Sequence, residues 1–214
     1  MVTPREVKRV TYSTEIRKLK KVPLNQYQYA ISAGSLLGDS CLRPNWSKTN
    51  YRFQVFHSVA QKAYLNWKYE ALKNLVLTPP QVYEKTNSIW FRTISHPSFS
   101  ILREKFYADK IKRLPYDIEE IISNPLSFAV WFMDDGNVVK DKDRVYGFHL
   151  NTQSFSFEEN KIIQNLLKKV WKIRSTIQNN NGYPRTYIGA EDKDKFVEIV
   201  SPFIISSMKY KIGA

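Results

Sequence analysis

The chain has 214 residues, 43% of them hydrophobic, with 33 lysines and arginines against 20 acids, a net charge of +13 and a pI near 9.7. It contains no apolar run of the roughly 18 to 20 residues that a membrane span needs, and its polar N-terminus lacks a signal-peptide core. The single cysteine, Cys41, excludes a disulfide framework and a thiolate zinc site. The basic balance favours a polyanionic partner such as nucleic acid.

Residues 1–23 form a basic N-terminal extension. Its first 21 residues hold seven lysines and arginines and two glutamates, a net charge of +5. Three interpretations stay open: an arm that grips DNA, a mitochondrial targeting segment, or a solvated tail. The two glutamates argue against a transit peptide, because such peptides are poor in acids.

Residues 24–115 are predicted to form the first half of the protein. Apolar residues at helical or alternating spacing predict each element. Helices are expected at 25–38, 60–75 and 97–108, and strands at 41–44, 51–57, 81–86 and 88–95.

Residues 116–124 read as a linker and residues 125–214 as a second half. Asn124 as a cap and Pro125 at the first helical position predict a helix that ends near Asp134. Ser156 and Glu159 have the spacing of a capping box at the start of another helix. The expected helices are 125–134, 157–170 and 192–200, and the expected strands are 137–141, 145–151, 172–178 and 184–189.

The two halves repeat each other. "AISAGSLLGDS" (30–40) and "LSFAVWFMDDG" (126–136) align without a gap, which places Asp39 on Asp135, 96 residues later. Ser58 and Ser154, each closing a strand-like run, are also 96 residues apart. The repeat predicts a mixed α/β (α+β) protein of two pseudo-two-fold related halves, each with one antiparallel sheet.

Two acids stand where a helix end is already negative. Asp39 and Asp135 follow the two repeated helices, whose C-terminal carbonyls and dipole disfavour carboxylates. Ala30, Gly34 and Gly38 form a small-residue stripe that would let the two helices approach closely. The acids would then meet and repel each other, and a divalent cation such as Mg²⁺ would relieve the repulsion.

The alternative is that each acid merely ends its helix and caps a turn. For one aspartate taken alone this capping role is the favoured interpretation. For a matched pair at the ends of both repeated helices, metal binding is favoured. Asp134 aligns with Gly38, so its carboxylate is expected to be dispensable and its carbonyl to be the useful part.

Several predicted strands alternate basic or amide side chains with apolar ones. Strands with this pattern can enter a major groove and contact base edges, although a solvated sheet face looks the same for any single residue. The candidate DNA contacts are Arg52, Gln54, Arg92, Lys140, Lys142, Lys172, Arg174, Thr176, Gln178 and Arg185. The three histidines have no metal-ligand spacing and are expected to serve packing or hydrogen bonding.

The segments "SLLGDS", "LSFAVWFMDDG", "LNTQSFSFEE" and "MKYKI" resemble the LAGLIDADG homing endonuclease family in its two-repeat, single-chain form, over about residues 24–212. Together with "VLTPP" they are similar to its omega-type mitochondrial intron endonucleases. The resemblance implies two αββαββα halves, with the motif helices packed at their interface and saddle-shaped sheets on DNA. It also implies cleavage of both strands with 3′ overhangs at a long asymmetric site.

The resemblance also implies roles for particular residues. Mg²⁺, with Mn²⁺ as a substitute, would be held by the carboxylates of Asp39 and Asp135 and the carbonyls of Gly38 and Asp134. Lys112 and Lys211, which end the two halves at similar distances from their acids, would polarise water or the scissile phosphate.

The sequence therefore predicts a monomeric, Mg²⁺-dependent endonuclease that cuts double-stranded DNA at a specific site, without a membrane partner. By analogy it works in a mitochondrion or another organelle. Two alternatives remain: a maturase that binds intron RNA, and a DNA-binding protein of the same fold that does not cut. The paired acids favour the nuclease over the first, and the paired lysines favour it over the second.

Overall fold

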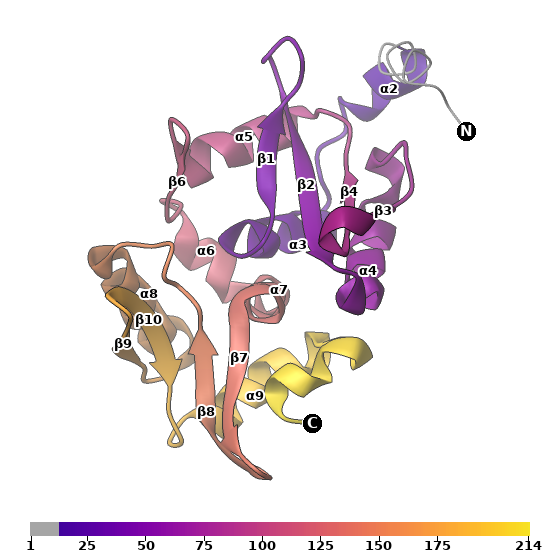
Figure 1. The fold of residues 1–214 in the computed structure, drawn as a ribbon. Helices are drawn as coiled ribbons and strands as arrows, with labels where there is room; N and C mark the ends of the chain where they lie inside the picture. Colours follow the sequence, from indigo (N-terminus) through magenta and orange to yellow (C-terminus); the bar gives the residue numbers. More distant parts are fainter. Residues whose placement is uncertain (1–12) are drawn as a thin grey trace. The chain divides into compact units, whose positions relative to one another are not determined.

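The computed structural model describes residues 13–214, which form two compact units (Figure 1). Unit 1 contains the described residues up to Tyr29 together with Ser40–Glu104. Unit 2 contains Ala30–Asp39 and Lys105–Ala214. The boundaries of these units differ from those of the two sequence repeats. The first repeated helix, α3 (Gln26–Leu37), has most of its length in unit 2.

Unit 1 is built on a four-stranded antiparallel sheet. Its strands, in spatial order, are β1 (Cys41–Pro44), β2 (Tyr51–Ser58), β4 (Ser88–Arg92) and β3 (Gln81–Tyr83). Two helices, α4 (Lys62–Leu72) and α5 (Pro97–Phe106), cover one face of this sheet. Phe99 of α5 stacks on Phe53 with ring centroids 5.7 Å apart, and Tyr69 of α4 contacts Phe91 edge-on. Burial of these aromatic rings holds the helices on the sheet.

The other face of this sheet is open and basic. Arg43 lies opposite Arg52, and Gln54 lies opposite Arg92, so all four residues share one face. The alternating residue Phe53 is fully buried on the helix side. The alternation seen in the sequence therefore gives a strand with one apolar and one polar face, as predicted.

Part of the basic N-terminal extension packs on unit 1. Helix α2 (Thr14–Leu19) is capped by Ser13 and buries Ile16. The Lys20 ammonium donates to the Ser95 hydroxyl at 3.5 Å, and a His96 ring nitrogen lies 3.3 Å from the Leu19 carbonyl oxygen. Residues 1–12, which carry the rest of the predicted extension, lie outside the described residues.

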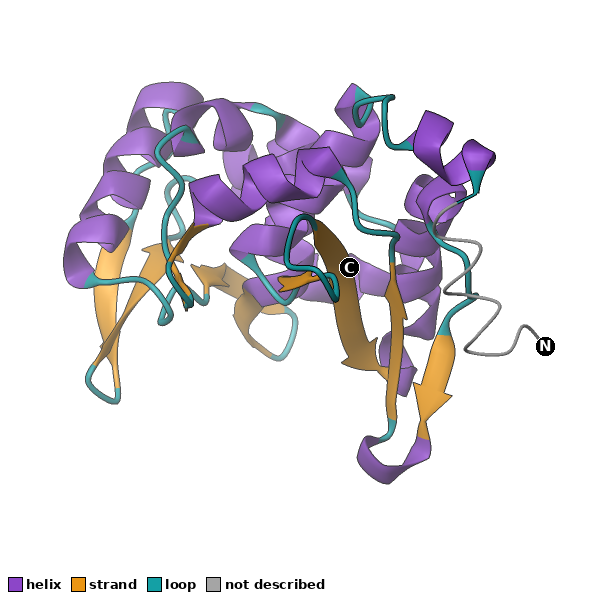
Figure 2. Cartoon of the chain, turned by 90° about the horizontal axis from the view of Figure 1, so that it is seen from above, coloured by secondary structure: helices purple, strands orange, loops and turns teal. Residues whose placement is uncertain are grey.

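Unit 2 contains a second four-stranded antiparallel sheet, and in each unit the helices lie to one side of the strands (Figure 2). The strand order is β7 (Gly136–Asp141), β8 (Arg144–Leu150), β10 (Tyr183–Ile188) and β9 (Thr176–Asn180). The helices are α7 (Pro125–Asp135), α8 (Phe157–Trp171) and α9 (Lys193–Val200).

Local signals in the sequence set the starts of two of these helices. The Asn124 side chain accepts hydrogen bonds from the backbone at the start of α7, and Ser156 and Glu159 form the predicted capping box of α8. Between helices and sheet, Phe132 and Phe148 each contact Phe196 of α9, with ring centroids 4.8 and 4.9 Å apart. This aromatic cluster is the centre of the unit 2 core.

Four parts of unit 2 differ from the sequence prediction. The predicted linker contains a helix, α6 (Ile118–Ser123), whose isoleucines are buried. The predicted strand 172–178 begins only at Thr176, because α8 continues to Trp171 and Lys172 caps it in the left-handed conformation (φ 57°). After α5 the chain forms a short hairpin of β5 (Tyr107–Ala108) and β6 (Ile111–Lys112), and near its end it forms the 3₁₀ helix η5 (Ser206–Ile212).

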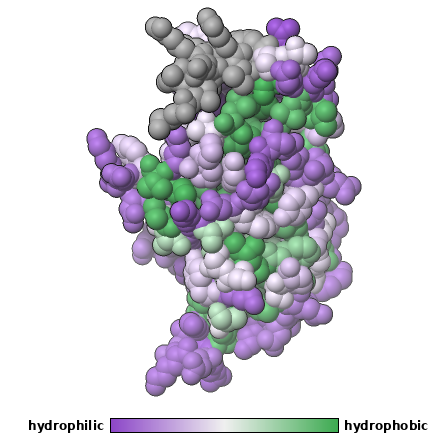
Figure 3. All heavy atoms as spheres, turned by 90° about the vertical axis from the view of Figure 1, so that its right-hand side faces the viewer, coloured by the Kyte–Doolittle hydropathy of each residue, from purple (hydrophilic) through white to green (hydrophobic). Residues whose placement is uncertain are grey.

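Hydrophilic residues make up much of the face shown in Figure 3, with hydrophobic residues exposed in patches between them. Among the described residues, no helix combines the length and the apolar character that crossing a membrane requires.

The end of α3 packs directly on α7 within unit 2. A Cβ atom added at Gly34 would overlap the backbone carbonyl oxygen of Ser127, and one added at Gly38 would overlap the side chain of Asp134. The predicted small-residue stripe therefore does allow close contact between the two helices. This contact brings together the two chain segments that carry the acids.

We expect Gly34→Ala to lower the free energy of unfolding by about 1 to 3 kcal/mol, because the new methyl group meets a backbone atom that cannot rotate away. Helix propensity alone predicts the opposite sign, a gain of about 1 kcal/mol. Urea unfolding at neutral pH measures the difference. Gly189→Ala is the matched control, because only a Tyr187 ring carbon, at 3.5 Å, lies near its new Cβ. A stabilised Gly34→Ala would contradict the close helix contact.

Candidate metal and catalytic site

Three aspartates gather where α3 and α7 end, and all belong to unit 2. Asp134 is buried, Asp135 is half-buried and Asp39 is exposed. A carboxylate oxygen of Asp39 and one of Asp134 lie within 4.8 Å of each other. The sequence predicted that Asp39 and Asp135 would meet; it did not predict that the Asp134 carboxylate would join them.

The position of the Asp134 side chain depends on Gly38. Because Gly38 has no Cβ, the Asp134 side chain occupies the space where one would lie. This side chain was expected to be dispensable, yet only 7% of the residue is exposed and it faces the other acids. A buried carboxylate is stable only beside compensating groups, so this side chain belongs to the charge balance of the site.

The Asp135 carboxyl has a strongly perturbed pKa. Burial is the largest cause, followed by the negative charges of Asp39 and Asp134, and together they raise the pKa from 3.8 to about 7. The positive charges of Lys112 and Lys211 act in the opposite direction. Three acids therefore face two lysines here, and the lysines do not offset the burial and the neighbouring acids at Asp135.

Each predicted lysine bonds to the residue that precedes its acid. Lys112, on β6, donates to the Gly38 carbonyl at 2.6 Å, and Lys211, in η5, donates to the Asp134 carbonyl at 2.8 Å. The two halves thus repeat this contact, which the sequence did not predict. Both carbonyls were predicted metal ligands; a carbonyl oxygen has two lone pairs, so a lysine bond leaves one available.

A divalent cation fits this group of residues. The ligands on offer are carboxylate and carbonyl oxygens, which Mg²⁺ and similar hard cations prefer. Burial, and next the negative charges of Asp39 and Asp134, disfavour the anionic form of Asp135, and a cation bound among the acids would reverse that effect. The fit rests on the chemistry of the donor set and on the excess of negative charge.

Buried polar contacts fix the chain just after the acids. The Asn151 amide N–H donates to the Asp135 carbonyl at 2.8 Å, which ties the end of α7 to the end of β8. Next along the chain, Thr152 is fully buried and bonds Asn160 of α8 and Thr186 of β10. Because no motif marks these threonine and asparagine contacts, sequence reasoning missed them.

The predicted DNA contacts of unit 2 fall into separate places. Gln178 and Arg185 lie opposite each other on β9 and β10, on the face away from the buried Thr186. Thr176, opposite Tyr187, is on that same open face. Lys142 lies in the turn between β7 and β8.

Three other candidates in unit 2 lie away from that open face. Lys140 lies opposite Val145 after a register shift, and Val145 lies with Phe148 on the helix side. Lys172 and Arg174 precede β9 instead of belonging to it. Arg174 is further engaged by ion pairs to Glu191 and Asp192, each at 2.9 Å. Lys172 and Arg174 were predicted to alternate on a strand, and the longer α8 corrects that placement.

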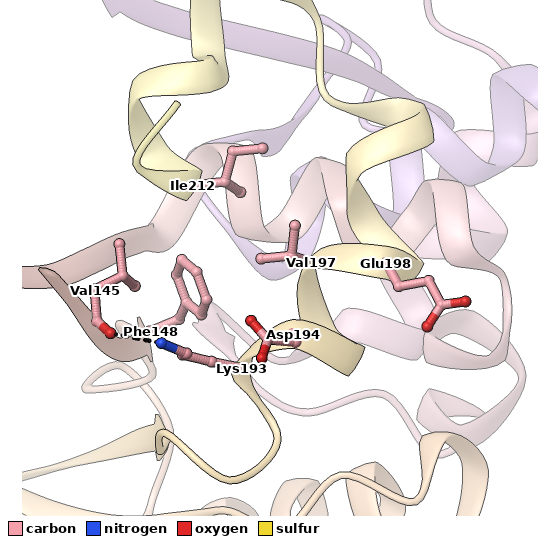
Figure 4. Close-up of a pocket in the computed structure, with 7 residues that line it drawn as sticks. All are labelled: Val145, Phe148, Lys193, Asp194, Val197, Glu198 and Ile212. Atoms are coloured by element: carbon pink, nitrogen blue, oxygen red, sulfur yellow. Dashed lines mark hydrogen bonds between the residues drawn. The ribbon is translucent and has the colours of Figure 1, made fainter. Parts of the chain in front are cut away.

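A cavity of about 450 Å³ lies on the helix side of the same sheet (Figure 4). It lies between β8, α9 and η5, and Val145, Phe148, Val197 and Ile212 supply its apolar wall. The Lys193 ammonium donates to the Val145 carbonyl at 2.9 Å at its edge. None of the predicted site residues lines this cavity.

Comparison with known proteins identifies relatives along most of the chain. The model of the LAGLIDADG DNA endonuclease family matches residues 29–196. A probable intron-encoded endonuclease of Wickerhamomyces canadensis is 30% identical over 198 residues, covering 88% of this chain and 85% of that protein. A cytochrome b mRNA maturase of Debaryomyces hansenii is 26% identical, covering 89% and 75%. The structure of the homing endonuclease I-WcaI bound to its DNA recognition sequence superposes with a TM-score of 0.83, at 26% identity, over 99% of this chain and 98% of that one.

The pKa of Asp135 predicts a pH dependence of stability in the absence of metal. As the pH rises from about 4 to 7, the unfolded chain loses this proton before the folded protein does, so Asp135 reduces stability across that window and fully above pH 7. In EDTA we expect Asp135→Asn to unfold at a higher temperature than the parent at pH 8, with the difference vanishing near pH 4.

Asp192→Asn is the control of opposite sign. Hydrogen bonds from Arg174 hold the pKa of Asp192 at about 2, so its stabilisation is present above pH 4 and is lost as the pH falls through 2. Its replacement should lower the unfolding temperature at pH 8. A parent protein more stable than Asp135→Asn at pH 8 in EDTA would contradict the repulsion among the acids.

Proposed function

We infer the function from one premise: this chain belongs to the LAGLIDADG DNA endonuclease family. It is a site-specific DNA endonuclease that acts on double-stranded DNA as a single chain. The observation that carries this conclusion is the cluster of Asp39, Asp134 and Asp135 with one lysine at each helix end. The family membership supplies the reaction class, and the cluster supplies groups suited to it.

We propose that Asp39 and Asp135 hold divalent metal ions, Mg²⁺ first and Mn²⁺ as a substitute. When bound, such ions activate water and stabilise the attacking and leaving oxygens of a phosphodiester. The Asp134 carboxylate is proposed to add negative charge that attracts the cation, so we infer that its position serves metal binding as well as packing. The carbonyls of Gly38 and Asp134 complete the proposed set of ligands.

Lys112 and Lys211 are proposed to place positive charge beside the scissile phosphate. Their bonds to the Gly38 and Asp134 carbonyls fix each ammonium group one residue away from an acid. A fixed cation stabilises the charge that develops on phosphate oxygens during the reaction. Since each lysine repeats the other, one acid–lysine set would serve each strand, which is consistent with a double-strand break leaving 3′ overhangs.

The open faces of the two sheets are the proposed DNA-contact surfaces. Arg52, Gln54 and Arg92 share the open face of the unit 1 sheet, and Thr176, Gln178 and Arg185 share that of the unit 2 sheet. The net charge of +13 supports binding to the phosphate backbone. Relatedness to a cytochrome b mRNA maturase favours an organelle as the place of action.

The same relative supports a second candidate function, assistance to intron splicing through RNA binding. A maturase has no need of a carboxylate cluster, whereas a nuclease does. The raised pKa of Asp135 therefore favours DNA cleavage as the main activity.

We expect Asp39→Asn or Asp135→Asn to reduce double-strand cleavage about a hundredfold or more, because each removes an anionic metal ligand. The substrate is a plasmid carrying a target selected from a randomised library, digested with Mg²⁺ and with EDTA. Glu198→Gln, an exposed acid on α9, should cut as the parent does. If the parent binds its selected DNA but never cuts it, the nuclease conclusion fails, and binding to the host intron RNA becomes the next assay.

Lys112→Met and Lys211→Met should each slow cleavage by about a hundredfold while leaving DNA affinity nearly unchanged, since the lysine acts on the transition state. Nicked plasmid, cut in one strand, and linear plasmid, cut in both, are separated on a gel, and their amounts give the rates of the two strand cuts. If either variant cuts both strands at the parental rate, its lysine has no catalytic role.

A further inference from the structure

A row of polar side chains crosses the open face of the unit 2 sheet. It runs from Asn151, which follows β8, through Asn137 on β7 and His149 on β8 to Gln178 on β9. The Asn151 amide donates to the Asn137 Oδ1 at 3.0 Å, and the Asn137 Nδ2 lies 3.4 Å from the His149 Nδ1. The His149 Nε2 lies 2.9 Å from the Gln178 Oε1. We call these four residues the polar row.

A backbone carbonyl fixes the direction of every hydrogen bond in the polar row. The Asn137 Nδ2 also lies 3.3 Å from the Val138 carbonyl oxygen, which can only accept. Asn137 must therefore turn its amino group toward Val138 and His149, and its oxygen toward Asn151. The His149 Nδ1 then accepts, so the ring's proton is on Nε2 and is donated to the Gln178 oxygen.

His149 is suited to the neutral form that this direction requires. Only 8% of the residue is exposed, and burial is the main cause that lowers its pKa; the bond to Gln178 acts against this shift and the positive charge of Arg185 adds to it. The Tyr187 ring packs beside the His149 ring, with the ring centroids 5.1 Å apart. The imidazole is therefore held in place and carries a single N–H.

This hydrogen-bond direction determines which group of Gln178 is available to a ligand. Gln178 is half-exposed on the open face. The bond from His149 takes one lone pair of the Gln178 oxygen and holds that oxygen toward β8, so the amide does not flip and its amino group, a donor, is the end left to contact a ligand. Arg185 lies directly opposite Gln178 in the strand register, and a guanidinium also only donates. Two donors thus stand side by side at this point of the sheet.

We propose that His149 is a positioning residue that locks the orientation of the Gln178 amide so that it presents its amino group to DNA, which favours a base edge that carries acceptors. Guanine fits best, because its O6 and N7 are both acceptors in the major groove, and thymine offers the single acceptor O4. The usual pairing of glutamine with adenine needs the glutamine oxygen turned toward the base as an acceptor, and His149 holds that oxygen toward β8 instead. The proposal rests on the proposed function, because it assumes that this sheet contacts DNA.

The test measures base preference directly. The full-length protein selects from a randomised DNA duplex library in Ca²⁺, and sequencing gives the base preference at each position. Gln178→Glu keeps an acceptor for His149 and turns a second acceptor outward. It should convert one position from guanine or thymine to a base with an amino donor, cytosine or adenine. Gln178→Lys, which can only donate, should keep the parental preference at that position.

His149→Phe removes the bond to Gln178 and keeps a ring. The freed amide can then pair with adenine, so discrimination against adenine at the same position should fall by about 5- to 100-fold, with other positions unchanged. Tyr187→Phe is the matched control: it loses the bond to Tyr146 on the same face but leaves Gln178 bound. It should retain the parental profile.

The outcomes separate this proposal from the proposed function. If the parent enriches no DNA sequence, the endonuclease conclusion fails and the proposal fails with it. If the parent enriches a site but Gln178→Glu changes the base preference at no position, only the proposal is overturned. The same holds if the parent prefers adenine at the position that Gln178→Glu changes. A parental profile for His149→Phe would also overturn it.

Discussion

The close packing of the end of α3 on α7 is the constraint on which the site depends. Gly34 brings the helix against the Ser127 carbonyl, and Gly38 leaves room for the Asp134 side chain. Both helices end at this contact, so their terminal carbonyls and their aspartates converge. Burial at this contact, with added repulsion from Asp39 and Asp134, raises the pKa of Asp135 to about 7. A site that is unfavourable when empty is favourable when a cation fills it.

The remaining structure of unit 2 holds this contact and connects it to the sheet. Lys112 and Lys211 bond the carbonyls just before the acids, and the Asn151 amide bonds the Asp135 carbonyl. From Asn151 the polar row continues to Gln178 on the outermost strand, β9. The same residue thus links the end of the acid-bearing helix to the face proposed to read bases. The groups proposed to position the phosphate and the face proposed to read bases are accordingly connected within unit 2.

Much of this arrangement could be predicted from sequence because it is periodic or repeated. The 96-residue repeat identifies Asp39 and Asp135 as a pair, and alternation identifies the open face of β2. Helix starts at Asn124 and Ser156 follow from local capping chemistry. Each of these signals depends only on neighbours in sequence or on a comparison of the two halves.

The parts that sequence could not give depend on contacts distant along the chain. The alignment put Asp134 opposite a glycine, and only the packing shows that this glycine makes room for its carboxylate. The pattern "KIRSTIQ" alternates like a strand, yet the helix before it runs on to Trp171 and removes Lys172 and Arg174 from the sheet. The direction of the polar row depends on one backbone carbonyl, that of Val138, which no sequence pattern marks.

The most direct test of the central claim is the proton balance of metal binding. Calorimetric titration of the protein with Mg²⁺ or Mn²⁺ near pH 7, in two buffers of different protonation enthalpy, measures the protons released per ion bound. We predict release near pH 7, because the pKa of Asp135 is about 7 before the cation binds. The release should disappear at pH 9 and in Asp135→Asn. Metal binding without proton release, or with equal affinity in Asp135→Asn, would contradict a cation held among the helix-end acids.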